Sequence, residues 1–411
     1  MQPCWLENLR KYKTLDVLRR STFFADCGEQ IEQFLKTPQI ASYPGASPRL
    51  DSFLRAAQWN IEKGKRFDAI LDRLQTDEIL KWADVILLNE VDHGMNRSGN
   101  RNVAHALAEH LGMHRVFAPA HFELTKGTDD ELLLEGENCE SLQGNAILSR
   151  YPILEARIVH LPVSFEPYEF HEKRFGWRNC LWARLQLKKS FLWVGSVHLE
   201  LRNTPRCRTA QIRHLIERLP GGEEESYLLG GDLNTNSFGR GTTWRTLQSV
   251  FRLLCSSPSR AKDQLLHPER GREPLFDVLA RKGFIWQGFN SHQETARAAI
   301  YSLEEAGSFP AILLDTLKRR LEPYEGYLCF KLDWLLGKNI QPLTGGKMKD
   351  ILTGTESVEP ACAQGENAGP CRLSDHLPIY ADLDIAYFDG DPIRNCQVSV
   401  AGKSVPERKM Q

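Results

Sequence analysis

The chain has 411 residues, of which 41% are hydrophobic and 26% charged, and its formal net charge is −1. This composition indicates a folded protein with a substantial core and argues against a strongly basic protein that coats nucleic acid. The sequence has no apolar run of about 18 residues and no apolar signal core after Met1, so we expect a cytoplasmic protein without stable membrane insertion.

The chain is expected to divide into three parts. Residues 1–50 are charged, carry scattered apolar positions and end in a loop with proline and glycine, which predicts a helical N-terminal extension. Residues 51–390 are expected to form one large catalytic domain, and residues 391–411 a C-terminal tail. Nothing in the sequence indicates an obligate protein partner.

The first half of the predicted domain alternates strands and amphipathic helices. An apolar run at 55–60 predicts a strand that ends in Asn60, and the spacing of apolar residues from Phe67 to Leu74 is typical of a helix. The continuous apolar run at 85–88 predicts a buried strand that carries Glu90 at its end. Further elements follow, namely a helix at 103–111 and strands at 145–149, 181–187 and 191–197.

The second half repeats this arrangement, with polar residues again at strand ends. The strand at 191–197 leads into His198, and the apolar run at 227–229 is followed by Asp232 and Asn234. The stretch 235–330 is too long for a structureless connection, so it must contain elements of its own. Two last strands are expected at 332–336, which bears Asp333, and at 377–383, which follows Asp375 and His376.

Six short motifs contain these polar residues. In chain order they are Trp59-Asn60, Asn89-Glu90-Val91, Val197-His198-Leu199, Gly230-Gly-Asp-Leu-Asn234, Lys331-Leu-Asp-Trp334 and Ser374-Asp-His-Leu-Pro378. Hydrolysis of a phosphate ester needs a divalent cation, a positioned nucleophile and a cationic or protonated neighbour for the leaving side. Carboxylates, amides and imidazoles supply these functions together.

The order and wording of the motifs resemble the endonuclease/exonuclease/phosphatase superfamily over about residues 55–388. This superfamily of metal-dependent phosphohydrolases includes deoxyribonucleases, abasic-site repair nucleases, sphingomyelinases and inositol-phosphate phosphatases. The resemblance implies an α/β (α+β) fold, a four-layer sandwich of two packed mixed β-sheets flanked by helices. It also implies Mg²⁺ or Mn²⁺ as the cofactor.

The resemblance assigns roles to the motif residues. It implies that the metal is held by Asn60, Glu90 and Asp375, and that catalysis is carried by His198, Asp232, Asn234, Asp333 and His376. Asp333 and His376 would form a carboxylate–imidazole pair, with His376 acting either as a general base or as a cation that faces the phosphoryl oxygens. His198 points away from the abasic-site repair branch, which has tyrosine at that strand end.

Substrate contacts are less specific in the sequence. Asn145 follows a glycine at a strand start and is a candidate for a support or phosphate role, with packing as the alternative. Guanidinium groups bind phosphate oxygens in pairs, so Arg97, Arg101 and Arg178 are candidate substrate contacts. For each arginine the alternative is a solvated surface position.

The predicted activity is hydrolysis of a phosphoester by in-line attack of water. A phosphodiesterase that acts on nucleic acid is favoured as the first hypothesis. A phosphomonoesterase or a lipid phosphodiesterase on the same site is the alternative, and a non-catalytic phosphate-binding protein is the hypothesis from another class. Abundant nuclease relatives favour the first, and the complete motif set disfavours the last.

Overall fold

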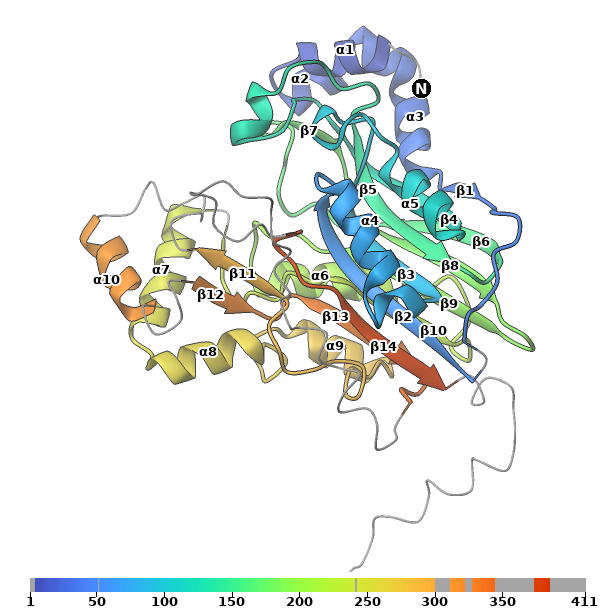
Figure 1. Ribbon diagram of the computed structural model, residues 1–411. Coiled ribbons are helices and arrows are strands. Elements are labelled where there is room, and N and C mark those ends of the chain that lie inside the picture. Colours follow the sequence, from blue (N-terminus) through green and yellow to red (C-terminus); the bar gives the residue numbers. More distant parts are fainter. Residues whose placement is uncertain are drawn as a thin grey trace, which may run out of the picture.

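The computed structural model describes residues 4–50, 52–240, 242–299, 311–321, 327–343 and 373–384 (Figure 1). The predicted C-terminal tail at 391–411 lies outside the described residues. Within the described ranges, no helix has the length and apolar character needed to cross a membrane.

Two mixed β-sheets form the centre of the molecule. The first contains β1 (Gln39–Ala41), β2 (Phe53–Lys63), β3 (Val85–His93), β4 (His114–Glu123), β5 (Leu142–Ser149), β7 (Arg174–Gly176) and β14 (Ile379–Asp384). The second contains β6 (Ile153–His160), β8 (Asn179–Gln186), β9 (Phe191–His198), β10 (Tyr227–Asp232) and β13 (Asp333–Lys338). A small third sheet pairs β11 (Ala296–Ala299) with β12 (Tyr327–Phe330).

Each of the two large sheets contains one parallel pair of strands among antiparallel neighbours. The first sheet runs β1-β4-β5-β3-β2-β14, and β7 pairs with β4; the second runs β13-β10-β9-β8-β6. In the first sheet β2 and β3 are parallel, and in the second β9 and β10 are parallel, whereas the other neighbours are antiparallel. Each parallel pair is joined through a helix, as such a crossover requires.

The helices are α1 (Cys4–Lys11), α2 (Leu15–Arg19), α3 (Thr22–Lys36), α4 (Phe67–Thr76), α5 (Val103–Leu111), α6 (Pro205–Ile216), α7 (Thr243–Leu254), α8 (Pro258–Leu266), α9 (Leu275–Arg281) and α10 (Ala311–Leu321). Helices α4 and α5 cover the outer face of the first sheet and α6 and α9 that of the second, and the described residues contain six further helices. Single 3₁₀ turns occur at η1 (Leu80–Trp82), η2 (Asn96–Ser98) and η3 (Asp129–Leu133). The helices at Phe67 and Val103 begin where the apolar spacing predicted them.

Three apolar cores define four layers. The first lies between the sheets and joins residues such as Leu87 of one sheet to Leu228 of the other. The second packs α4 and α5 against the first sheet, and the third packs α6 and α9 against the second. The predicted four-layer sandwich is therefore confirmed, because each sheet has one face in the central core and one face under helices.

Glycines let β10 approach its neighbours closely just before Asp232. A Cβ at Gly230 would lie 2.6 Å from Cδ1 of Leu87 in the opposite sheet. Gly231 has a φ of +154°, and a Cβ there would lie 1.8 Å from the carbonyl oxygen of Val197. Only glycine fits at such approaches, so the Gly-Gly pair sets how deeply Asp232 sits between the sheets.

The N-terminal helices pack on the end of the first sheet, at the top of Figure 1, through a fourth apolar core. This core includes Leu9, Ile31, Phe122 and Phe175. The Tyr168 hydroxyl donates a hydrogen bond of 2.6 Å to the carbonyl of Leu9, which fixes α1 to the loop before β7. In the stretch 235–330 the structure describes α7 to α10 with β11 and β12, which confirms that this stretch has its own elements.

Candidate active site

The sheet registers bring three of the predicted residues into one row. Asp232 at the end of β10 pairs with His198 at the end of parallel β9 and with Asp333 at the start of antiparallel β13. Asn60 lies on β2 in the facing sheet, and its amide nitrogen donates to Oδ2 of Asp232 at 3.2 Å. The two sheets therefore meet at Asp232, although the residues are far apart in the sequence.

Asp232 is the centre of this arrangement. Its Oδ2 lies 3.3 Å from Nε2 of His198 and 3.8 Å from Nε2 of His376. Burial alone would raise the pKa of Asp232, but the two imidazoles and the backbone N–H of Asn234 outweigh burial and lower that pKa. Asp232 is therefore ionised at neutral pH.

Asp333 and His376 form the carboxylate–imidazole pair that the sequence predicted. Nδ1 of His376 lies 2.7 Å from Oδ2 of Asp333, and Gln58 donates to the other oxygen at 3.1 Å. Burial opposes the charged form of His376, but Asp333, Asp375 and Asp232 raise its pKa well above the usual value. Of the two roles left open, this geometry favours the imidazolium over the free base.

Glu90 occupies an irregular position within β3. The sequence predicted it at the end of the strand, but β3 continues to His93, and its pairing shifts between Leu88 and Val91. Glu90 lies in this bulge with a φ of +51°. A bulge re-aims the side chain that it contains, which explains how a mid-strand residue reaches the cleft.

Basic side chains around Glu90 stabilise its charge. Its Oε1 lies 4.0 Å from Nε2 of His198, and its side chain is 24% exposed. Burial would raise the pKa of Glu90, but His198, Lys63, Arg178 and Arg174 lower it to about 2. Glu90 thus presents an ionised carboxylate to solvent at the mouth of the cleft. We refer to Glu90, His198, Asp232, Asp333 and His376 as the catalytic cluster.

Asp375 lies at the exposed rim beside this cluster. Its Oδ1 accepts a hydrogen bond of 3.4 Å from the Ser374 hydroxyl. The protein atoms crowded around it raise the pKa of Asp375 to about 6, with a smaller contribution in the same direction from Glu90 and Glu62, although His376 opposes the shift. Such crowding of carboxylates favours a bound cation.

The donor chemistry fits a hard divalent cation. Glu90, Asp375 and the side-chain oxygen of Asn60 offer the oxygen ligands that Mg²⁺ and Mn²⁺ prefer. The Asn60 oxygen accepts the backbone N–H of Glu62 at 3.2 Å, which holds the amide in the cleft. Asp232, Asp333 and His376 also have ligand atoms within 4.8 Å of one another, but the contact between Asp333 and His376 engages two of these atoms.

A chain of buried amides supports the cleft, and sequence reasoning missed most of it. Asn89 accepts the Asp232 backbone N–H at 2.9 Å and the Gln58 amide at 3.1 Å, and it donates to Asn145 at 2.8 Å. Asn145 in turn donates to Asn179. Asn145 is buried and acts as a support in this structure. Gln58 lies two residues before Asn60, so the period of a strand was the signal that could have found it.

Asn234 lies beyond the end of β10. It has a φ of +50°. Its backbone N–H donates to Oδ1 of Asp232 at 2.9 Å, and its amide donates to the Leu199 carbonyl at 2.9 Å. Asn234 therefore orients Asp232 directly.

Arg97 is placed where it cannot reach a substrate. Its side chain has no exposed surface and forms two hydrogen bonds with Asp92, at 2.8 and 3.0 Å. It also pairs with Glu131 at 3.2 Å and Glu172 at 3.3 Å. We define an ionic cluster with the members Lys63, Asp92, Arg97, Glu123, Glu131, Glu172 and Arg174. Arg97 satisfies buried carboxylates, which corrects its expected role as a phosphate contact.

The other two arginines have different surroundings. The Arg101 guanidinium lies 4.9 Å from the centre of the Phe67 ring, on the side of α4. Arg178 reaches the catalytic cluster: its Nη1 lies 2.7 Å from Nδ1 of His198, and its Nε lies 3.7 Å from Glu200. Of the three arginines, Arg178 is the one that directly contacts a residue of that cluster.

A shallow pocket, open to solvent, adjoins Arg178. Its lining combines arginines and aromatic rings, among them Arg174, Arg178, Arg202, Phe165 and Trp177. Glu200 and Gln211 add polar groups. The pocket thus extends the cleft with groups that suit an anionic and partly apolar molecule.

A family model described as the Endonuclease/Exonuclease/phosphatase family matches residues 57–376. The chain belongs to this family. Its members are metal-dependent phosphoesterases, so the chain is placed among hydrolases of phosphoester bonds. The match includes every motif residue discussed above, from Asn60 to His376.

Solved structures give weaker likenesses. An endonuclease/exonuclease/phosphatase from Beutenbergia cavernae DSM 12333 is 16% identical, with 81% of this chain and 72% of that chain covered and a TM-score of 0.43. Humanized D. rerio TDP2 is 15% identical, with 81% and 99% covered and a TM-score of 0.40. An AP endonuclease from Archaeoglobus fulgidus is 13% identical, with 80% and 99% covered and a TM-score of 0.42. No curated protein matches the chain.

Proposed function

We propose that the chain is a Mg²⁺- or Mn²⁺-dependent phosphodiesterase whose first candidate substrate is a nucleic acid. The observation that carries this proposal is the contact of two imidazoles with one ionised carboxylate, Asp232, beside the ionised Glu90. Nucleophile positioning, charge stabilisation and proton donation then lie within one cleft. In-line attack of water on phosphorus needs these three functions and a cation.

Glu90, Asn60 and Asp375 would hold the cation, which when bound neutralises charge on the phosphoryl oxygens. Asp232 accepts a hydrogen bond from the attacking water and orients it. Because its pKa is lowered, Asp232 is a weak base. We therefore propose that Asp232 mainly positions the attacking water and does not fully remove its proton. Asn234 assists by fixing the carboxylate through its backbone N–H.

The two histidines take complementary roles. His376, held protonated by Asp333, faces the phosphoryl oxygens as a cation. At His198 the tautomer follows from its partner: a guanidinium has only donors, so Nδ1 must accept from Arg178 at 2.7 Å. The proton of His198 therefore lies on Nε2, which is 3.3 Å from Oδ2 of Asp232 and would donate to the substrate in place of that carboxylate.

The pocket beside Arg178 supports a diester over a small monoester. A diester carries an organic group on each side of phosphorus, and the second group needs space next to the reacting centre. The pocket offers that space, with rings on which a base can stack. A phosphomonoesterase or a lipid phosphodiesterase would use the same catalytic cluster with a different group in this pocket.

A screen with Mn²⁺ at low salt tests the proposal. Purified protein is incubated with plasmid DNA, single-stranded DNA, RNA, sphingomyelin and inositol phosphates, with Asp232→Ala as the inactive control. We expect cleavage of DNA or RNA that excess chelator abolishes and that weakens with salt, because phosphate contacts release counterions. Turnover of a small phosphomonoester or of sphingomyelin alone would overturn the nuclease assignment. A folded protein that cleaves none of these substrates would point instead to phosphate binding without catalysis.

A further inference from the structure

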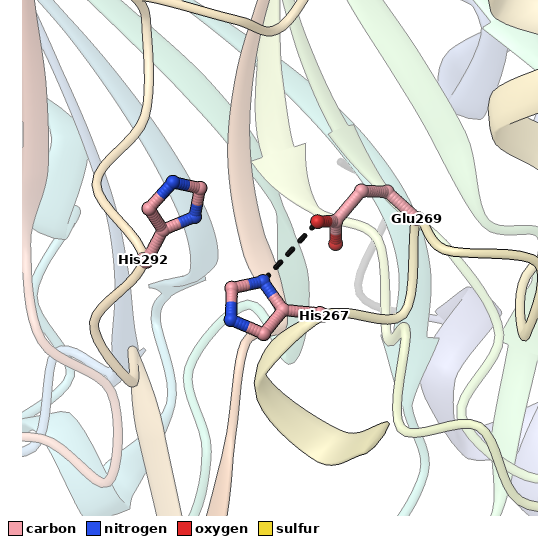
Figure 2. Close-up of side chains that lie close together, drawn as sticks. All are labelled: His267, Glu269 and His292. Atoms are coloured by element: carbon pink, nitrogen blue, oxygen red, sulfur yellow. Dashed lines mark hydrogen bonds and ion pairs between the residues drawn. The ribbon is translucent and has the colours of Figure 1, made fainter. Parts of the chain in front are cut away.

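Three side chains outside the catalytic cluster, His267, Glu269 and His292, face one another (Figure 2). His267 caps the C-terminal end of α8, Glu269 follows in the next turn, and His292 comes from the segment before β11. One ligand atom from each lies within 4.8 Å of the others. Two distant stretches of the chain therefore bring two imidazoles and a carboxylate together.

The contacts inside this group leave ligand capacity. Nδ1 of His267 lies 3.2 Å from Oε1 of Glu269, and the two imidazole ring centres lie 5.0 Å apart. The second oxygen, Oε2 of Glu269, is buried and has no hydrogen-bond partner among the described residues. A buried carboxylate oxygen without a partner is unfavourable, so a ligand that satisfied it would be stabilising.

The surrounding charges orient the first imidazole. Nε2 of His267 lies 3.9 Å from Oδ1 of Asp263, on the side of the ring opposite Glu269. At 3.9 Å the two groups form no hydrogen bond, but a small movement of exposed Asp263 would bring its carboxylate to the outer nitrogen, where it could fix a metal-binding imidazole. Arg270 opposes a cation here, since its Nε lies 3.8 Å from Oε1 of Glu269, but it also bonds to Asp263 at 3.2 Å.

We propose that His267, Glu269 and His292 bind a transition-metal ion of the Zn²⁺ type. Two imidazole nitrogens and one carboxylate oxygen form a donor set that suits Zn²⁺ and differs from the all-oxygen set at Glu90. Bonds of about 2.0–2.2 Å require the three ligand atoms to draw closer than they are here. Exposed His292 is free to make that movement and leaves a fourth position to water.

The ion would brace the catalytic cluster from behind. Three residues after His292, Thr295 accepts the backbone N–H of Asp333 at 3.0 Å with its hydroxyl. Its carbonyl accepts the N–H of Leu377 at 2.7 Å, and Ala296 forms a bridge with His376. On the other side, Leu265 near the end of α8 accepts the Lys331 N–H at 3.1 Å. A metal that joined α8 to the segment 292–296 would therefore fix the backbone around both Asp333 and His376.

The inference is independent of which phosphoester the chain cleaves, and metal binding can be measured without substrate. The full chain is stripped with chelator and then titrated with Zn²⁺ or Co²⁺ in excess Mg²⁺, so that Mg²⁺ occupies the oxygen site. We expect one tightly bound equivalent, a Co²⁺ absorption spectrum typical of nitrogen and oxygen ligands, and a higher Tm. His292→Ala should weaken binding by about 100-fold or more and abolish the rise in Tm.

Two variants make the result interpretable. His105→Ala removes an exposed histidine that has a single carboxylate 4.0 Å away at Glu109, so it should leave Zn²⁺ binding unchanged. Glu90→Gln alters the oxygen site of the catalytic cluster, and this variant should still bind one equivalent of Zn²⁺. The proposal is overturned if the wild-type chain binds no Zn²⁺, if His292→Ala binds it normally, or if Glu90→Gln loses it. Since His292 is exposed, its replacement does not endanger folding.

Discussion

The ionic cluster and the catalytic cluster are neighbouring groups of buried charge with opposite designs. In the ionic cluster the guanidinium of Arg97 meets Asp92 in a two-bonded fork, with contacts of 2.8 and 3.0 Å. In the catalytic cluster one oxygen of Asp232 is shared by His198, His376 and Asn60 at 3.2–3.8 Å. The first arrangement commits Arg97 and Asp92 to each other, whereas the second holds groups close that remain able to exchange partners.

The two clusters also influence each other. Lys63 and Arg174 belong to the ionic cluster, yet both help to lower the pKa of Glu90. Two cations of the ionic cluster thus also stabilise a carboxylate that faces solvent. The comparison teaches that paired charge provides the frame, and that unpaired carboxylates mark the place where we propose that a cation and a substrate bind.

The largest effect is expected when the matched cluster is broken. Arg97→Met removes the cation and leaves buried Asp92 and its neighbours unpaired, which should reduce the free energy of unfolding by about 3–5 kcal/mol. Urea unfolding followed by circular dichroism measures this. Arg101→Met, on an exposed arginine, is the matched control and should change stability little. If Arg97→Met lowers the free energy of unfolding by less than about 1 kcal/mol, the ion pairs of Arg97 do not stabilise the fold as proposed.

Changes in the catalytic cluster should act mainly on turnover. Asp232→Ala or His376→Ala removes water positioning or the facing cation, so kcat should fall on the order of 10²-fold or more. Steady-state kinetics with Mn²⁺ measures this, and a thermal melt checks that each variant is folded. Retention of more than a third of kcat in a folded variant would show that the residue has no part in the reaction.

A smaller effect, and one that metal reverses, is expected at Glu90. Glu90→Gln keeps the shape of the side chain but removes its charge, so the cation should bind more weakly, by roughly 10–100-fold. Activity measured over a range of Mn²⁺ concentrations should then recover in part at high Mn²⁺. If saturating Mn²⁺ binds normally and restores nothing, Glu90 is not a ligand of the catalytic metal.

The smallest expected effect is a change with pH in the stability that the ionic cluster provides. Burial opposes the charge on Glu131, but Arg97 and Lys63 lower its pKa below the usual 4.5, and the pKa of Glu172 is lowered in the same sense. Because the unfolded chain then binds more protons, this stabilisation is present above roughly pH 5 and is lost as the pH falls. The stability difference between wild type and Arg97→Met should therefore shrink from pH 7 towards about pH 4. A difference that stays constant over this range would mean that these carboxylates are not ionised partners of Arg97.

Much of the fold was predictable because it follows local patterns. The apolar spacing from Phe67 predicted helix α4 and its buried face, and the continuous apolar run from Val85 predicted the buried strand β3. Polar residues that interrupt such runs, as Asp232 does, indicated where the cleft forms. The four-layer arrangement followed from the family resemblance, since periodicity by itself does not distinguish it from other α/β folds.

The rest depended on contacts between distant residues. Arg97 looks like a surface arginine in the sequence, because its partners Glu123, Glu131 and Glu172 come from three other segments. The left-handed turn at Asn234 suits asparagine, but the residue type alone does not show that the strand ends at Asp232. The buried face of a strand can be inferred from its local sequence, whereas the partners of a buried charged side chain cannot.

The left-handed backbone of Glu90 sets stability against activity at a single position. A residue other than glycine with a φ of +51° carries strain, of the order of 1–3 kcal/mol in such conformations. Glycine adopts this backbone without strain, so Glu90→Gly would relieve the fold while it deletes the carboxylate. Selection for a more stable chain without selection for activity should therefore favour loss of this glutamate, and the strained bulge persists only while the carboxylate is needed.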